Sequence, residues 1–492
     1  MNATTRRPWP VVDTDGRGVV SHAGTALLRE LGERSGLRAC LSEAMDGTRI
    51  RAGGHDGGQV LVDLAVMLAD GGETIGDIAA LTQQPDLHGS VASPATAWRV
   101  LAGIDQDRLD EVGQARAAAR ERAWLARADI TGQMLPPARA AGRDLDYVVL
   151  DLDATLIEVH SEKEQASPHF KGGFGYHPLL CFLDNTNEAL SGILRTGRAG
   201  SNTAADHVHV LTQALGQLPE TARAGRILVR TDGAGYSHAF LEHLVDTGLE
   251  YSIGYAVADD VRDAITMLPE WAWTEAIDAD GGHRDGAQIA EITTVLQEVT
   301  RLRVAERRRR SRREGKRDSR SSSSRRTWPE GMRIIVRRER PHPGAQLDAF
   351  EHRDGWRYQA MTTNTTVGQL AFLDARHRAH ARVEDRIRQA QNAGLHRLPS
   401  RVFSINAAWL MLALTAADLL AWTQTILLTS TDDKTKTLAR AEWKTIRYRL
   451  LHTGARITRT ARRIHLHLSE GWPWAHALAR AFTVLRRIPV PA

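Results

Sequence analysis

Apolar residues recur at helical spacing through the first part of the chain. Between residues 22 and 125 they follow a period near 3.6, with no alternating strand pattern, as in the series Val60, Leu61, Leu64, Ala65 and Leu68. Within this part, Ser93 is a natural N-cap and Pro94 suits the first helical position, so a helix is expected to begin there. The first part of the chain is therefore expected to be helical.

The middle of the chain has a different pattern. Short apolar runs, typical of buried strands, occupy residues 147–150, 177–183, 227–230 and 251–257. Helical stretches near 203–216 and 237–246 lie between them. Strands that alternate with helices indicate an α/β sheet that is buried on both faces.

From residue 260 to 362 the pattern changes again. Strand-like runs at 288–295, 332–337 and 356–362 flank a segment rich in arginine and serine, 301–326. That segment is too polar to pack in a core, so we expect it to be disordered or to order only on binding. Beyond residue 369 the chain is expected to be helical to about residue 485.

The longest apolar run extends from Ala407 to Trp422 and is interrupted by Asp418. It is shorter than the roughly 18 residues that a membrane span needs. We expect a buried helix and no contact with a membrane.

Charge is distributed unevenly along the chain. The net charge is +5, but residues 301–326 carry 13 basic residues against 3 acidic ones, and residues 434–487 carry 13 against 2. The rest of the chain is therefore acidic. Basic segments on an acidic body are typical of a protein that binds a polyanion, although a solvated charged surface is the simpler alternative. Two cysteines, Cys40 and Cys181, are too few for a disulfide framework and suit a reducing cytosol.

Two short helices in the N-terminal part are arranged in sequence like a helix-turn-helix. The first covers residues 74–81 and the second begins at Ser93, so that Thr96 and Arg99 are presented on it. Since many small helical bundles share this pattern, DNA contact by Thr96 and Arg99 is one of two open interpretations.

Acidic residues follow two of the expected strands. Asp151 and Asp153 come at the end of the first strand and project to the same face, because successive side chains of a strand alternate. Asp232 follows the strand at 227–230, where nearby glycines suit a tight turn. Ligands of open α/β sheets bind outside the carboxyl ends of strands, so these acids can converge.

A third candidate acid, Glu384, lies far downstream. It stands in a helical segment with His380 four residues before it and Arg388 four residues after it. Taken alone, this helix is typical of a salt-bridged surface.

Taken together, these residues resemble the transposases of bacterial insertion sequences, DDE group 1, whose catalytic core is ribonuclease H-like. The resemblance covers residues from about 140 to 425. The matching blocks are Asp153-Ala-Thr155, Lys171-Gly-Gly-Phe-Gly-Tyr176-His-Pro178, Gly200-Ser-Asn202-Thr-Ala-Ala-Asp206, Asp232-Gly-Ala-Gly-Tyr236 and Glu384-Asp-Arg-Ile-Arg388.

The chain departs from the family pattern in two places. The family often has a tyrosine or arginine before the glutamate and a lysine two helical turns after it, but this chain has His377, His380 and Gln391 there. Loss of the lysine removes an interaction with DNA phosphate. The arginine-rich run 307–326 also has no counterpart in the pattern, so its role is open.

The resemblance implies a catalytic site of three metal-binding carboxylates. Asp153 is expected to bridge two divalent ions, while Asp232 binds one ion and Glu384 the other. Phosphodiester transfer builds charge on the attacking and leaving oxygens, and two ions about 3.5–4 Å apart stabilise both. Hard, oxygen-preferring Mg²⁺, or Mn²⁺ in its place, suits carboxylates better than thiols or imidazoles.

The implied reaction begins with hydrolysis of a strand at the end of the element, after which the freed 3′-hydroxyl attacks target DNA. A hairpin at the donor end is left open. The expected partners are double-stranded DNA, at terminal repeats and target, and a second copy of the chain in the synaptic complex. Phosphates near the metals are expected to be contacted by Lys171, Arg230, Arg386 and Arg388. The protein is expected to act in the bacterial cytoplasm.

Two alternatives remain. The run Asp151-Leu-Asp153-Ala-Thr155 also fits the haloacid-dehalogenase phosphatase signature, in which Asp151 is the nucleophile and Asp153 the acid or base. That interpretation leaves Glu384, the basic segments and the flanking helices without a use. The other alternative is a catalytically inactive DNA-binding derivative.

The sequence thus predicts an α/β protein with a ribonuclease H-like catalytic core that is split by a mainly β insertion and flanked by helical regions. The expected divisions are a helical DNA-binding region (1–135), the first part of the core (144–258), the insertion (259–362), the second part of the core with the glutamate helix (363–425) and a basic helical region (426–492).

Overall fold

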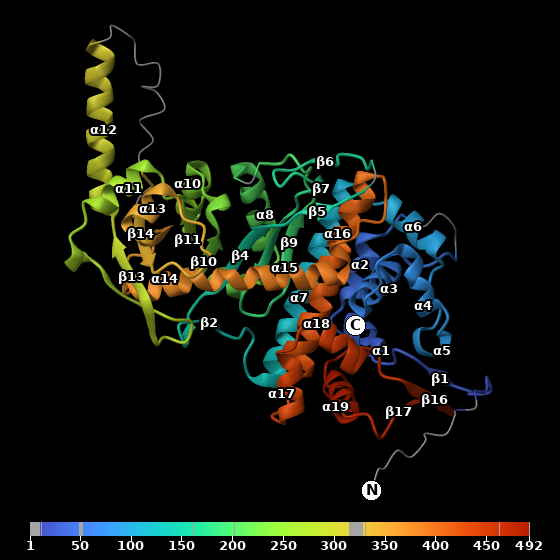
Figure 1. Ribbon diagram of the computed structural model, residues 1–492. Coiled ribbons are helices and arrows are strands. Elements are labelled where there is room, and N and C mark those ends of the chain that lie inside the picture. The colour runs from blue at the N-terminus through green and yellow to red at the C-terminus, as the bar shows by residue number, and fades with distance from the viewer. Residues whose placement is uncertain are drawn as a thin grey trace.

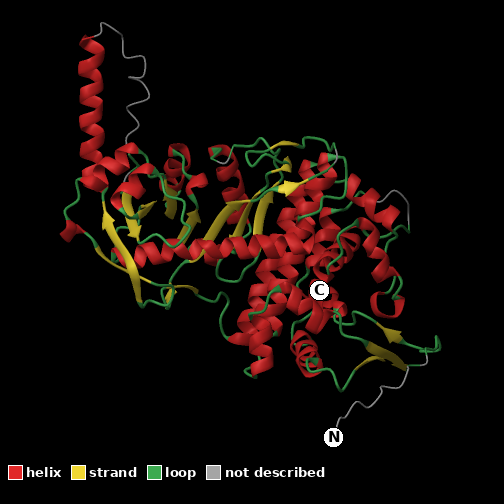
Figure 2. Ribbon diagram, viewed as in Figure 1, coloured by secondary structure: helices red, strands yellow, loops and turns green. Residues whose placement is uncertain are grey.

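The computed structural model describes residues 10, 12–48, 53–160, 162–200, 202–313, 328–329, 331–461 and 463–491. A nine-stranded sheet occupies one side of the molecule, and a body of helices formed by both ends of the chain occupies the other (Figure 1, Figure 2). This mixed α/β architecture, with helical ends, confirms the predicted fold class.

The N-terminal part is helical, as its periodicity predicts. Ser93 caps one helix by accepting a hydrogen bond from the Thr96 amide, with Pro94 at the first helical position. Asp56 caps another helix by accepting from the Gln59 amide. The helices are α1 (Thr25–Arg34), α2 (Leu37–Ala44), α3 (Gly57–Asp70), η1 (Ile75–Ile78), α4 (Ala79–Thr82), α5 (Pro85–His88), α6 (Pro94–Ala102) and α7 (Gln106–Thr131).

The large sheet has the strand order β12-β13-β14-β15-β11-β10-β4-β8-β9. Its middle strands β4, β10 and β11 are parallel, whereas β8 pairs antiparallel with β4 and β9 pairs antiparallel with β8. Three antiparallel strands followed by two parallel ones, in the order β9-β8-β4-β10-β11, form the expected ribonuclease H-like core. The core elements are β4 (Val148–Ala154), β8 (Leu179–Leu183), β9 (Ala189–Ile193), α8 (Ala204–Gly216), α9 (Glu220–Arg223), β10 (Ile227–Thr231), α10 (His238–Asp246) and β11 (Glu250–Tyr255).

Short strands surround this core. The ribbon β2 (Ala138–Ala140) and β3 (Arg143–Leu145) precedes β4, and β5 (Ile157–Glu158), β6 (Ser167–Pro168) and β7 (Phe174–Tyr176) form a small sheet after it.

Opposite faces of β4 have different neighbours. Val148, Leu150 and Leu152 pack into a core shared with α8 and α10. Val149 packs with residues of the other face. Asp151 and Asp153 alternate with the first set, so they lie on that other face, as predicted.

The insertion continues the core sheet. Its strands β12 (Thr274–Ile277), β13 (His283–Glu291), β14 (Arg333–Glu339) and β15 (Arg357–Thr363) extend the sheet from β11 by antiparallel pairing. Helix α11 (Asp259–Thr266) precedes β12 in sequence, and α13 (Ala349–Asp354) lies between β14 and β15.

One expectation for the arginine-rich segment is wrong. Residues 301–313 belong to α12 (Thr293–Arg313), which stands away from the sheet (Figure 1). Its base is held by burial of Leu296 and Val299 and by ion pairing of Arg303 with Asp263 of α11. The rest of the segment, 314–326, lies outside the described residues.

The second part of the core crosses one face of the sheet. Helix α14 (Leu370–Arg378), the 3₁₀ turn η5 (Ala379–Ala381) and α15 (Arg382–Ala390) run nearly in line across it (Figure 1). After the turn η6 (Gln391–Leu395), α16 (Phe403–Trp422) and η7 (Thr423–Leu427) enter the helical body and pack against α3 and β9.

Among the described residues, one helical run, Phe403–Leu427, is long and apolar enough to cross a membrane, and 78% of its most apolar window is buried within the protein. It is a core helix, as expected.

The C-terminal region differs from the expectation of an all-helical tail. It contains α17 (Asp433–Ala439), α18 (Trp443–Ile446), the π-helical turn η8 (Arg447–Leu451) and α19 (Ala475–Leu485), but also a hairpin of β16 (Ala455–Thr460) and β17 (Arg463–Leu468). Strand β1 (Val19–Val20) pairs with β16. The hairpin forms because apolar and polar residues alternate there, a strand period that its high charge obscured.

Candidate active site

Two of the predicted acids lie side by side at the carboxyl ends of adjacent parallel strands. Strand β4 pairs with β10 so that Leu152 is opposite Thr231. Asp153 and Asp232 each follow one residue later. The register therefore brings together two acids that are 79 positions apart, because parallel neighbours end at the same edge of a sheet.

The turn at Asp232 depends on two glycines. Asp232 accepts a hydrogen bond from the Ala234 amide at 3.0 Å and begins a tight 3₁₀ turn. A Cβ at Gly235 would lie 2.1 Å from Thr231 Oγ1, and one at Gly254 would lie 2.4 Å from the Gly233 nitrogen. Close approach, and not a positive φ, is therefore the reason for glycine at these two positions.

Glu384 faces the same place from the first turn of α15. Asp232 and Glu384 both line a cavity of about 420 Å³ between the ends of β10 and β11, the insertion strands β14 and β15, and the helical run α14–α15. Glu384 is exposed, as is Asp232. The structure thus brings the helical glutamate to the strand-borne acids, the convergence on which the three-carboxylate prediction depends.

The three acids also influence one another electrostatically. Burial raises the pKa of Asp153 to about 6, with further increases from the negative charges of Asp232 and Glu384, while His380 opposes the shift. Three carboxylates that repel each other at neutral pH are a suitable environment for a bound cation. The donor set is all oxygen, which suits Mg²⁺ or Mn²⁺.

The spacing of the three acids bears on how many ions they can hold. Among the described residues, their oxygens do not meet the condition that three ligand atoms all lie within 4.8 Å of one another. Two ions about 3.5–4 Å apart separate their outermost ligands further than a single ion does. The three acids are thus not drawn together as the ligands of a single ion, and their use of two ions stays a prediction.

Directly beneath the acids lies a buried cluster of ion pairs. Arg230 contacts Asp151 at 2.7 Å and Asp184 at 2.8 Å. Arg386 contacts Asp151 at 2.8 Å and also pairs with Asp184. Both arginines are almost fully buried, so the expectation that Arg230 and Arg386 contact DNA phosphates is wrong. Their charges are used inside the protein, where they attach α15 to β4 and β10.

Asp151 belongs to this cluster and is inaccessible. Its side chain is 0% exposed and also accepts from His380 Nδ1 at 2.9 Å. Although burial raises its pKa, the Arg230 charge and the His380 hydrogen bond hold that pKa well below the ordinary value. A nucleophile must reach its substrate, so this burial argues strongly against the phosphatase alternative.

The residues at which the chain departs from the family pattern, His377, His380 and Gln391, lie inside the protein beside the site. His377 Nδ1 lies 3.0 Å from Ser252 Oγ, and burial lowers its pKa to about 3. Gln391 donates to Thr155 Oγ1 at 3.0 Å, two residues after Asp153. His380 Nε2 is buried without a hydrogen-bond partner among the described residues. These side chains support the site from inside.

The other predicted DNA contacts lie apart from the carboxylates. Lys171 is exposed in the loop before β7, over the Phe170 ring. Arg388 is exposed on α15 and pairs with Asp385 and Glu442. Thr96 is half-buried and Arg99 exposed on α6. None of these four lines the cavity at Glu384, and DNA contact by them stays a prediction.

Sequence reasoning missed residues that only a tertiary contact reveals. Asp184 follows β8 and joins the buried cluster, where it also accepts from Arg382 at 2.6 Å. Its place after an apolar strand was an available signal. Arg337 and Arg378 line the cavity and share Asp374, at 2.8 and 2.7 Å. No sequence signal joined the insertion to the active site.

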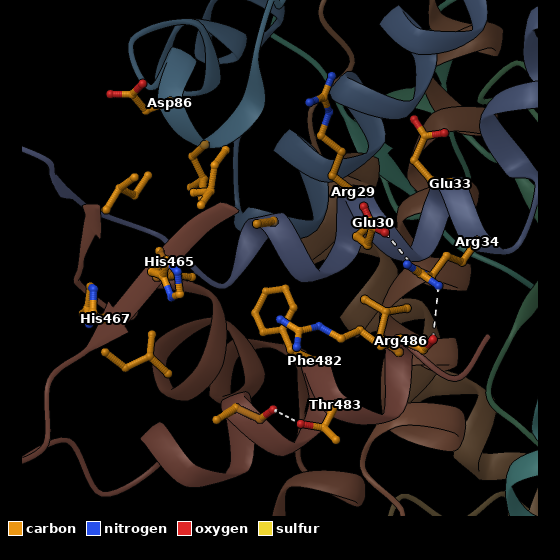
Figure 3. Close-up of a pocket in the computed structure, with 18 residues that line it drawn as sticks. Arg29, Glu30, Glu33, Arg34, Asp86, His465, His467, Phe482, Thr483 and Arg486 are labelled. Carbon is orange, nitrogen blue, oxygen red and sulfur yellow. Dashed lines mark hydrogen bonds and ion pairs between the residues drawn. The ribbon is translucent and has the colours of Figure 1, made fainter. Parts of the chain in front are cut away.

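A second, larger cavity of about 880 Å³ lies far from the acids, between α1, α19 and the β16–β17 hairpin (Figure 3). Its lining includes Arg29, Arg34, Arg486 and Glu30. Arg34 donates to Glu30, one turn earlier on α1, at 2.8 Å. The three predicted acids are not among its lining residues, so size alone does not identify the active site.

Comparison with known proteins agrees with the resemblance drawn from the sequence. The family model described as transposase DDE domain group 1 matches residues 4–490. No curated protein matches the chain. A similar solved structure is a piggyBac transposase synaptic complex with hairpin DNA, at 8% identity and a TM-score of 0.44, covering 89% of this chain and 81% of that one. Because the family model covers nearly the whole chain, this protein belongs to the transposase DDE domain group 1 family.

Proposed function

We propose that this protein is an active DNA transposase that cuts an insertion sequence at its terminal repeats and joins it to target DNA, in the bacterial cytoplasm. Asp153, Asp232 and Glu384 are its catalytic carboxylates. The observation that carries the proposal is the approach of Glu384 on α15 to the two acids at the sheet edge, where partial burial and then the charges of Asp232 and Glu384 raise the pKa of Asp153.

These three residues would hold the divalent ions. Bound Mg²⁺ or Mn²⁺ supplies a Lewis acid that stabilises charge on the attacking and leaving oxygens.

The chain's own contribution is to position these acids. The buried pairs of Arg230 and Arg386 with Asp151 hold α15 against β4 and β10, which sets where Glu384 stands. Since displacement by about 1 Å can cost about 100-fold in rate, this attachment is part of the catalytic design. Arg230 and Arg386 are therefore proposed as positioning residues.

DNA is proposed to reach the site along exposed basic surfaces. Residues 307–310 on α12 are exposed arginines. The hairpin β16–β17 carries exposed Arg456 and Arg459 at the opposite end of the molecule. Two separated basic surfaces suit a protein that must hold a terminal repeat and a target, and we expect a dimer on DNA because two ends must be brought together.

The test is cleavage of labelled duplexes that carry the ends of the element. With Mg²⁺ or Mn²⁺, the wild-type protein is expected to nick at the repeat boundary, and chelator is expected to abolish nicking. Asp153→Asn, Asp232→Asn and Glu384→Gln are each expected to remove it. Asp385→Asn is the matched control, because Asp385 is the exposed neighbour of Glu384 and pairs only at the surface.

Each alternative predicts a different result in the same assay. A phosphatase would hydrolyse a phosphomonoester and lose that activity in Asp151→Asn, with no nicking of duplex DNA. An inactive derivative would retain the duplexes in a binding assay but nick none of them with either metal. Cleavage that survives Glu384→Gln would refute the assignment of this residue.

A further inference from the structure

Three side chains from distant segments meet where the N-terminal and C-terminal parts of the chain pack together. His22 precedes α1, Asp70 ends α3, and His452 follows η8. Among the described residues they form the group of histidine and acidic side chains whose ligand atoms all lie within 4.8 Å of one another. None of them lines the cavity at Glu384, so the cluster is separate from the proposed active site.

The two imidazoles face the two oxygens of one carboxylate. His22 Nδ1 lies 2.6 Å from Asp70 Oδ2, and His452 Nε2 lies 3.2 Å from Asp70 Oδ1. Their rings stack with centroids 4.0 Å apart and planes inclined by 17°. Two nitrogens and a carboxylate therefore point into one small space.

One oxygen of this carboxylate is not satisfied. The Asp70 side chain is only 10% exposed, and its Oδ1 is buried without a hydrogen bond among the described residues. His452 Nε2 is directed to the Asp70 carbonyl oxygen, at 3.0 Å. The nitrogen paired with Oδ1 is thus His452 Nε2, at 3.2 Å and aimed at a different oxygen, so an ion would satisfy this buried acceptor better than the contact now present.

The backbone around the cluster holds these groups in place. His22 has a φ of +51°, a left-handed conformation that costs a residue with a Cβ about 1 kcal/mol or more and is found at ligand clamps. The next residues are fixed by hydrogen bonds from Ala23 to Thr453, at 2.9 Å, and from Gly24 to Leu451, at 3.1 Å. The backbone thus keeps the three residues together, and an ion would bind in exchange for the protons of the hydrogen bonds that His22 Nδ1 and His452 Nε2 make to Asp70.

We propose that His22, Asp70 and His452 form a structural site for a divalent cation of the Zn²⁺ class. Two imidazole nitrogens and one carboxylate oxygen are donors that Zn²⁺ prefers and Mg²⁺ does not, and a water completes four-coordination. The ion joins the N-terminal helices to the C-terminal region.

A buried cation beside the cluster leaves the carboxylate available. Arg447 lies close to Asp70, and burial lowers its pKa to about 10. Its Nε donates to the Ala69 carbonyl oxygen at 2.6 Å, and one terminal nitrogen donates to the Asn392 carbonyl oxygen at 2.8 Å. The positive charge of Arg447 weakens binding of a metal ion nearby, but its hydrogen bonds go to main-chain carbonyl groups and leave the imidazole and carboxylate ligand atoms available.

The test is metal binding by the full-length protein. The titrations use Asp153→Asn protein, so that the catalytic carboxylates are not a complete site, after removal of metal with a chelator. Zn²⁺ is expected to bind with one equivalent and raise the unfolding temperature, and Co²⁺ is expected to give the visible absorption of a four-coordinate site. Mg²⁺ at the same concentration is expected to do neither.

Variants of the ligands complete the test. His452→Gln and Asp70→Asn keep polar side chains but remove a ligand, and we expect Zn²⁺ affinity to fall by more than the roughly 10–100-fold that loss of a ligand's hydrogen-bond partner costs. His476→Gln, an exposed histidine on α19, is the matched control and should bind normally. Absence of Zn²⁺ binding before these changes, or equal binding after both, would overturn the proposal.

Discussion

Asp418 is the single acid in the longest apolar run of the chain, and its replacement gives the sharpest test of how the helical body is held together. Its side chain is 1% exposed and accepts from Arg116 and Arg120 of α7, at 2.7 and 2.5 Å. It also accepts from the Ala189 amide at the edge of the sheet, at 3.2 Å. One carboxylate thus joins α16, α7 and β9.

The structure gives the magnitude for Asp418→Asn. Breaking a buried ion pair by removing one partner costs about 3–5 kcal/mol, because the remaining charge is left uncompensated. Arg120 keeps Glu188 at 3.0 Å, but Arg116 keeps only main-chain carbonyl and thioether acceptors. Because one of the two arginines keeps a charged partner, we expect the free energy of unfolding to fall by an amount at the lower end of this range, about 3 kcal/mol. This is a large fraction of the stability of an ordinary domain.

The assay is urea unfolding followed by tryptophan fluorescence. Trp124 and Trp422 both donate from their indole nitrogens to Glu188, so they report directly on this cluster. Asp285→Asn is the control, since that side chain is fully exposed, and its unfolding midpoint should match the wild type.

A double variant isolates the pair. Combining Arg116→Met with Asp418→Asn should cost less than the sum of the single changes, because the uncompensated charge is removed together with its partner. If Asp418→Asn lowers stability by less than about 1 kcal/mol, or if the two changes are additive, the ion pair does not hold these elements together.

Three further predictions concern the site and the basic helix. Burial and the charges of Asp232 and Glu384 raise the folded-state pKa of Asp153 from 3.8 to about 6, so the unfolded chain ionises first and stability falls as pH rises through this interval. In the presence of chelator at pH 7, the free energy of unfolding of Asp153→Asn, measured with urea, should therefore exceed that of the wild type by up to about 3 kcal/mol. This gain should vanish below about pH 4, and a gain that is independent of pH would contradict a raised pKa of Asp153. Arg230→Met leaves the buried Asp151 with fewer partners, and should lower both stability and DNA nicking, by about 3 kcal/mol for unfolding; a variant of normal stability would refute the role of the cluster. Replacing the arginines at 307–310 with glutamine should reduce the slope of log affinity for duplex DNA against log salt by about 0.9 for each phosphate that is no longer neutralised, and an unchanged slope would show that α12 does not bind DNA.

Much of the architecture could be predicted from local pattern. The strands that become β4, β10 and β11 are short apolar runs with turn residues at their ends, and the caps at Ser93 and Ser237 mark where α6 and α10 begin. Period and capping act over a few residues, so the chain alone carries this information. The acids at the ends of β4 and β10 were visible for the same reason.

The sequence could not show what the arginines near the acids do. Arg230 and Arg386 look like phosphate-binding residues in sequence, whereas in the fold they are buried against Asp151 and Asp184. A basic residue has the same local signature whether its partner is DNA or a buried carboxylate from a distant segment. Only tertiary packing decides between them.

The sequence by itself determined the N-terminal helices, the strands and helices of the catalytic core, the two acids at strand ends and the family to which the chain belongs, because these depend on neighbours along the chain. The tertiary structure decided where Glu384 stands, that the insertion strands extend the core sheet beside the acids, and that His22, Asp70 and His452 meet. These features arise from contacts between segments far apart in sequence, and sequence spacing does not encode their distances.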